Sequence, residues 1–178
     1  MFEKDVNPEG IALLYRKAIA DGLDLFAAAG GFYLEERRTE ADTSLWAAQF
    51  GATCTLSQAN ALLLTAGGGY FDHGNIQGKK ALGITPDEFY GNRSTDDVYD
   101  SDFDMAQAFG EVRFTAGRLP CRVFADYVRN TAAASGEDEG YLWGAGVGAC
   151  KKPGNWQLIY NYRRIEADAI LGVLAEAK

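Results

Sequence analysis

The chain has 178 residues, with 17 lysines and arginines against 25 aspartates and glutamates and a formal net charge of −8. This length fits one domain, and the negative charge argues against a nucleic-acid partner, because nucleic-acid phosphates bind basic surfaces. No apolar stretch reaches the roughly 18 residues of a transmembrane helix, so any membrane crossing would have to use strands.

Eight stretches of the sequence alternate residue by residue between two kinds of side chain. Successive side chains of a β-strand point to opposite faces, so each stretch predicts a strand. The third stretch is the most regular, with Trp46 and Phe50 on one side and Gln49 on the other. In chain order, the predicted strands are residues 11–19, 23–36, 45–56, 61–71, 105–115, 121–130, 141–150 and 156–163.

The connections between these stretches are short and long in turn. The short ones are residues 20–22, 57–60, 116–120 and 151–155, and the long ones are residues 35–44, 72–104 and 131–140. Outer-membrane barrels have short turns at one end and longer loops at the other. We therefore expect the three long connections to share one end. Residues 72–104 are predicted to form a long acidic loop, and a connection of that length is usually functional or disordered.

The last predicted strand, residues 156–163, indicates which face of the sheet would contact lipid and which would contact water. Its Trp156, Leu158, Tyr160 and Tyr162 fall on one side, opposite a mainly polar face. Aromatic rings gather at the membrane–water boundary, whereas the lumen of a membrane barrel is polar. We therefore predict an all-β fold, an antiparallel up-and-down transmembrane β-barrel or part of one, with about eight strands. The set predicted to face outward is Trp46, Phe50, Val123, Tyr127, Trp143, Trp156, Leu158, Tyr160 and Tyr162. Residues 165–178 fit a helix or a further strand equally well.

Two segments carry a family resemblance. Residues 122–130 read RVFADYVRN, and residues 156–169 read WQLIYNYRRIEADA. Together they resemble a family of bacterial putative porins, which are outer-membrane β-barrels of Gram-negative bacteria. The resemblance implies localisation in the cell outer membrane and contact with a lipid bilayer or detergent. It also implies passive diffusion of small hydrophilic solutes or ions. The absence of a visible signal sequence and the ending at Lys178 favour a segment of a longer barrel, so residues 1–178 form either a single barrel domain or part of one.

The polar face supplies the candidate site. Nine side chains are predicted to line a water-filled lumen: Arg16, Asp24, Gln49, Glu111, Arg113, Arg122, Asp126, Asn161 and Arg163. Residues of opposite charge among them would give little net ion preference. The same pattern also fits the solvated outer face of an ordinary sheet. Arg122 and Asp126 are four residues apart on one strand face, so each is expected to pair with a neighbouring strand.

The acidic run holds a second candidate. Asp96, Asp97, Asp100, Asp102 and Asp104 could narrow a pore or collect a hard cation such as Ca²⁺, although the glycine and terminal glutamate of a calcium loop are missing. A solvated surface loop is the simpler interpretation. The spacing of Cys54, Cys121 and Cys150 fits small apolar strand residues. No catalytic constellation is present, so we expect no enzyme activity, no cofactor and no bound metal.

Two alternatives to a channel remain open at this point. A soluble eight-stranded barrel could bind a small apolar ligand, with Trp46 and Phe50 inside while Gln49 meets water. A structural membrane barrel could instead have a lumen filled by side chains, because eight strands leave room for little else. The sequence does not indicate the oligomeric state.

Overall fold

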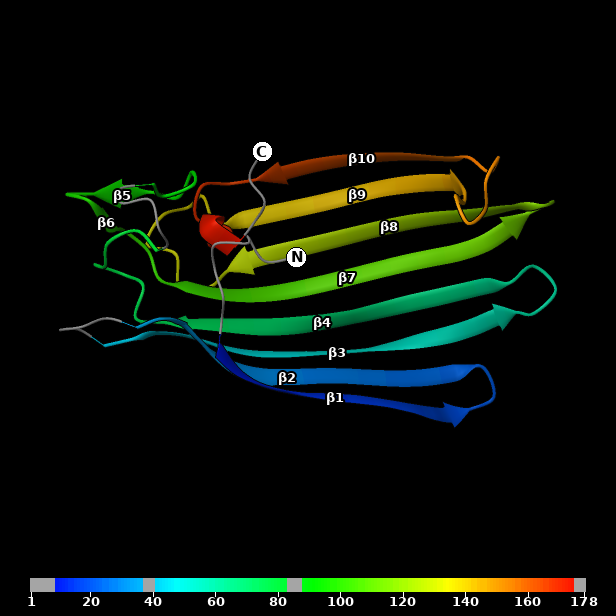
Figure 1. Ribbon diagram of the computed structural model, residues 1–178, viewed down its shortest axis with the longest axis horizontal. Helices are drawn as coiled ribbons and strands as arrows, with labels where there is room; N and C mark the ends of the chain where they lie inside the picture. The colour runs from blue at the N-terminus through cyan, green and yellow to red at the C-terminus, as the bar shows by residue number, and fades with distance from the viewer. Residues whose placement is uncertain (1–8, 37–40, 83–87, 175–178) are drawn as a thin grey trace.

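The computed structural model describes residues 9–36, 41–82 and 88–174. Most of these residues belong to one large antiparallel sheet (Figure 1). Its eight strands follow one another in the order β1-β2-β3-β4-β7-β8-β9-β10. Their bounds are β1 Glu9–Ala20, β2 Leu23–Glu35, β3 Thr43–Ser57, β4 Leu62–Gly74, β7 Phe103–Ala116, β8 Leu119–Asn130, β9 Glu139–Gly148 and β10 Gln157–Ile165. The predicted all-β, up-and-down arrangement is therefore confirmed. The sheet is open, with β1 and β10 at its two edges.

The connections fall at two ends, as predicted. The short turns between paired strands lie at one end, here called the turn end, and the long connections lie at the other, the loop end (Figure 1). The β1–β2 turn uses Gly22 at φ +74°, a backbone conformation that glycine adopts without strain. The Gly22 carbonyl accepts a hydrogen bond from the Thr55 amide at 2.6 Å, which ties this turn to β3.

The register places the tryptophan and tyrosine side chains of the eight strands on one face of the sheet. We call it the aromatic face, and it carries Trp46, Phe50, Trp143 and Tyr160. Eight of the nine residues predicted to face outward lie on this face, and Trp156 is exposed just before β10. Trp46 is 65% exposed and Phe50 68%, whereas Gln49 between them is half-buried. The soluble-barrel alternative predicts the reverse, with Gln49 more exposed than Trp46 and Phe50.

The hydrophobic core lies at the loop end, outside the body of the sheet. Ile76, Leu82, Tyr99, Phe103, Leu171 and Val173 form one buried cluster. Apart from Phe103, which begins β7, these residues come from two connections, residues 75–82 with 88–102 and residues 166–174. Together with residues 131–138, the described parts of these connections form what we call the cap. The hairpin of β5 Ser94–Thr95 and β6 Val98–Tyr99 belongs to it, as does the 3₁₀ turn η1 Gly172–Leu174.

The segment after β10 follows neither of the two predictions made for it. Amides of Glu166 and Asp168 still donate to the carbonyls of Glu139 and Glu137, at 3.0 and 2.9 Å. The chain then turns into the cap, where Leu171 and Val173 join the buried cluster. Its apolar residues serve this local core, which explains a pattern that fitted a helix and a strand equally well. Residues 175–178 lie outside the described part. In the ranges that are described, no helix has the length and apolar character needed to cross a bilayer.

Candidate functional site: the polar face and its cap

The nine residues predicted to line a lumen all lie on the same face of the sheet. We call it the polar face, and the strand register defines it. One row across the strands runs from Arg16 through Phe26, Gly51, Gly67, Phe109, Asp126 and Leu142 to Arg163. The next row towards the turn end contains Asp24, Glu111 and Asn161. Residues that are far apart in sequence therefore share one surface.

A chain of polar contacts crosses the middle of this face. The Gln49 amide donates to Gln107 at 3.1 Å, and the Gln107 amide donates to both carboxylate oxygens of Asp126, at 3.0 and 2.8 Å. The chain spans β3, β4, β7 and β8, and Gly69 on β4 leaves the space through which the two glutamines meet. Gln107 was not among the predicted residues. Its position on the same alternating face of residues 105–115 was the available signal.

Charged pairs occupy the half of the polar face nearer the turns. Glu111 contacts Arg113 at 2.5 Å and Arg122 at 3.8 Å, and Arg16 lies 3.5 Å from Asp24. Arg122 also lies over the ring of Phe124, 5.1 Å from its centroid. Both Arg122 and Asp126 pair with β7, as the sequence predicted. The arginines are substantially exposed, so these pairs contribute little stability and their charges act mainly on solvent.

Phenylalanine rings and glycines share the same surface. Phe26 and Phe109 stand on β2 and β7, yet their stacked ring centroids are 6.3 Å apart. The two strands between them carry Gly51 and Gly67 in this row, and a Cβ at Gly67 would come within 2.6 Å of the Phe109 ring. The rings therefore lean across the glycines and do not project straight from the sheet. The polar face is therefore flatter here, between the Gln49–Gln107–Asp126 hydrogen bonds and the charged pairs.

The cap covers the loop end of the polar face. The residues Thr43, Leu45, His73, Phe103 and Asn130 stand on this face at the strand ends, and each is no more than 5% exposed. On the aromatic face at the same level, Trp46 and Asp72 are exposed. A Cβ at Gly140 of β9 would likewise lie 3.5 Å from Ala169 of the cap. The cap thus folds towards the polar face.

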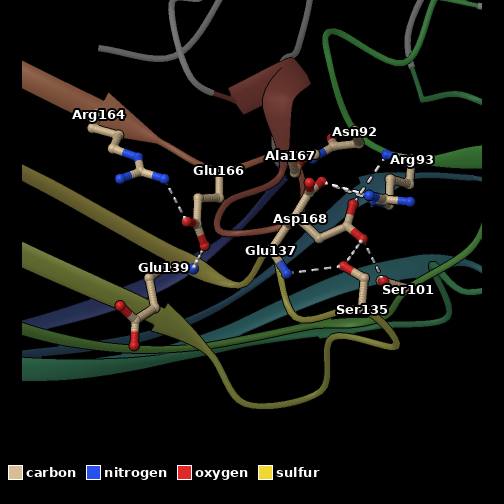
Figure 2. A network of polar contacts seen from close by, with 10 residues as sticks. All are labelled: Asn92, Arg93, Ser101, Ser135, Glu137, Glu139, Arg164, Glu166, Ala167 and Asp168. Atoms are coloured by element: carbon tan, nitrogen blue, oxygen red, sulfur yellow. Dashed lines mark hydrogen bonds and ion pairs between the residues drawn. The ribbon is translucent and has the colours of Figure 1, made fainter.

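One carboxylate joins the three connections of the cap. Asp168 is fully buried, and one of its oxygens accepts hydrogen bonds from the Ser101 hydroxyl at 2.8 Å and the Ser135 hydroxyl at 3.1 Å. Its other oxygen accepts from the Arg93 amide at 3.0 Å. Figure 2 shows these contacts converging on Asp168 from three parts of the chain. We call this arrangement the Asp168 junction.

Two buried asparagines support the junction from either side. The Asn130 amide donates to the carbonyls of Asp102 and Asp168, both at 2.8 Å. The Asn92 amide donates to the carbonyls of Ala167 and Ile170, and its oxygen accepts from the Gly172 amide. At the surface, Arg93 pairs with Glu137 at 2.8 Å, which raises the pKa of the arginine. Asn92, Arg93 and Glu137 did not stand out in the sequence, because such contacts have no periodic pattern.

The predicted acidic run divides between a hairpin tip and structural positions. Asp96 and Asp97 form the exposed β5–β6 turn, with φ angles of 53° and 60°. The carboxylate of Asp100 accepts a hydrogen bond from Thr95, and that of Asp102 accepts one from the Phe103 amide. Asp104 lies in β7 on the aromatic face. Among the described residues, no group of three or more histidine, cysteine, aspartate or glutamate side chains is placed to hold a metal ion.

Comparison with known proteins gives one family. A family model described as "Putative porin" matches residues 1–107, which is more than half of the chain. No curated protein and no solved structure matches the sequence.

Proposed function

Because the chain belongs to the putative porin family, we propose that it forms the wall of an outer-membrane channel for the passive diffusion of small hydrophilic solutes or ions. The observation that supports this most directly is the separation of the two faces. Nine predicted lumen residues share the polar face, while the tryptophan and tyrosine side chains of the large sheet share the opposite face. In a bilayer, the aromatic face would contact lipid and the polar face would contact water.

The mechanism is physical and requires no chemical step. A closed sheet pairs its backbone amides and carbonyls, so the wall is stable in hydrocarbon. The amides of Gln49 and Gln107 offer hydrogen bonds that replace part of a solute's hydration. The arginines near the turn end face Asp24 and Glu111, so this half of the lumen carries both signs of charge. Such a lumen passes small polar solutes with weak charge preference.

The two edges of the sheet must be paired in such a channel. β1 and β10 each have a neighbour on one side only, and unpaired backbone groups cost several kcal/mol each in hydrocarbon. Closing the eight strands on themselves would leave an interior only wide enough for side chains. We propose that further strands pair with β1 and β10 and that the complete wall has more than eight.

Reconstitution of the complete protein into planar bilayers tests the proposal. We expect stepwise ionic conductance, and we expect the purified protein to need detergent, because the aromatic face would otherwise meet water. A protein that stays monomeric and monodisperse without detergent would contradict the membrane assignment. A protein that inserts into lipid without conducting would instead support a structural barrel.

A further inference from the structure

We propose that a basic hollow at the turn end binds the phosphate headgroup of an anionic phospholipid. The hollow lies between the β7–β8 turn and the β9–β10 connection, and the charged residues that line it are Arg118 and Lys151. This inference rests on the proposed function, because it requires the sheet to stand in a bilayer. It concerns the lipid that contacts the wall at its turn end, and the lumen takes no part in it.

The first step is the way in which the backbone places Arg118. The β7–β8 turn consists of Gly117 and Arg118, between the paired residues Ala116 and Leu119. Gly117 has φ +63°, and a glycine at positive φ is typical of the first position of such a two-residue turn. Arg118 therefore occupies the tip of the hairpin, where it is exposed.

A second turn places Lys151 beside that tip. The Asn155 amide donates to the Lys152 carbonyl at 3.1 Å, around Pro153 and Gly154. Proline followed by a glycine at positive φ, here +86°, is the pattern of a type II turn. Because β8 and β9 are paired strands, the β9–β10 connection lies next to the β7–β8 turn (Figure 1). Lys151 and Arg118 thus line one hollow.

The second step is the charge of this region. Arg118, Lys151 and Lys152 are exposed, and none of them has an ion pair with any residue that the structure describes. Among the described turn-end connections, the single carboxylate is that of Asp21, in the β1–β2 turn at the opposite edge of the sheet. The described residues of the cap have the reverse balance of charge. An anion is therefore attracted to this part of the turn end, although the chain as a whole is acidic.

The third step identifies the anion as a lipid headgroup. The hollow has a volume of about 380 Å³, and Leu119 and Trp156 line it beside the two cations. Both are exposed, as is Leu158, which continues the apolar surface along the aromatic face. Cations next to exposed apolar side chains fit a molecule with an anionic head and hydrocarbon chains, and tryptophan is enriched at headgroup level. A free phosphate ion would gain nothing from Leu119 and Leu158.

The test is a lipid-retention measurement on the complete protein. The protein is reconstituted in vesicles with equal amounts of anionic phosphatidylglycerol and of phosphatidylcholine, which has no net charge. It is then extracted in mild detergent, and native mass spectrometry counts the lipids of each kind that stay bound. We expect the wild type to retain phosphatidylglycerol preferentially. Arg118→Gln or Lys151→Gln should each lower this preference about fivefold, the contribution of one basic residue near an anionic lipid surface.

The matched control is Lys17→Gln, which removes one exposed cation from the edge strand β1, near the same end of the sheet. Its lipid preference should equal that of the wild type. Lys151→Arg keeps the charge in the hollow and should keep the preference as well. Equal losses in Lys17→Gln and Lys151→Gln would overturn the site, because lipid selection would then follow the overall charge of the protein.

The remaining outcomes separate this site from the channel itself. A wild type that inserts into the vesicles but retains both lipids equally would overturn the site and leave the channel proposal standing. Titration calorimetry with inorganic phosphate is the second arm, and binding of phosphate without any lipid preference would show a site for the free ion and overturn the lipid assignment. A wild type that does not insert into the vesicles would overturn the proposed function together with this site.

Discussion

The body of the sheet and the cap differ in what stabilises them. Among the residues that the structure describes, every buried residue other than glycine lies in the cap or at the strand ends beneath it. The cap has the apolar cluster and buried hydrogen bonds of a small soluble domain. The body has two faces that differ in polarity and no core between them. Its stability must therefore come from the backbone hydrogen bonds between strands and from surroundings in which exposed apolar side chains such as Trp46, Phe50 and Leu158 are favourable.

The largest expected effect is the loss of a core residue from the cap. Leu171 is 1% exposed, and Leu171→Ala should destabilise the cap by about 2–5 kcal/mol, because large-to-small core changes leave a cavity. Amide hydrogen exchange should quicken at residues 131–138 while amides in the middle of β7 and β8 keep their protection. Leu158→Ala, on the aromatic face, is the control, and the cap should not respond to it. Equal loss of protection in the cap and the strands would show that the two regions are one cooperative unit.

The next largest effect separates the two faces of the body. Ala66 lies mid-strand on the aromatic face of β4, and Ala28 lies mid-strand on the polar face of β2. Ala66→Arg should cost about 2–4 kcal/mol in lipid vesicles, the cost of an arginine near the bilayer midplane. Ala28→Arg should cost far less, because its charge reaches a wet lumen. Urea unfolding in vesicles measures both, and equal costs would contradict the assignment of the faces.

The strand body could be predicted from the sequence, but the cap could not. Alternation around Trp46, Gln49 and Phe50 identifies a strand and assigns its faces, because period two is a local property of the chain. The strand ends differed by a few residues, as for β3, which begins at Thr43 where residue 45 was predicted. The Asp168 junction depends on contacts between residues 33 to 75 positions apart, and no local pattern signals them. The sequence also does not indicate which face residues 75–82 and 88–102 fold onto.

A smaller effect concerns charge at the tip of the cap. Asp96 and Asp97 are exposed, and asparagine tolerates their positive φ angles, so replacing both with Asn should leave the hairpin intact. At low salt, the cation-over-anion permeability ratio should fall by about sixfold per charge, because a unit charge at roughly 8 Å in water raises the local cation level and lowers the local anion level by a factor of about 2.4 each. At 0.15 M salt the Debye length is about 8 Å, so the difference should shrink. Reversal potentials across planar bilayers measure the ratio. Asp21→Asn in the β1–β2 turn is the control at the opposite end, and an unchanged ratio in the double variant would remove the tip from ion selection.

The smallest effect is expected at the surface of the cap. The Arg93–Glu137 pair is short, but both side chains are 49% exposed. Exposed ion pairs contribute about 0–1 kcal/mol, so Arg93→Ala should change cap stability by less than that. Hydrogen exchange of the cap measures the change. A loss as large as that of Leu171→Ala would mean that the surface pair stabilises the cap as strongly as its core does.

The neighbour-by-neighbour order of the strands has a consequence for assembly in time. Each strand pairs with the one before it in the sheet, so the wall can grow hairpin by hairpin, and four of these pairings close only a short turn. The Asp168 junction has no such local route. Asp168 follows β10 and meets Ser101, which precedes β7, across 67 residues. The cap is therefore expected to form last, and a nascent sheet that has not yet added β10 lacks the Asp168 junction that joins its three connections.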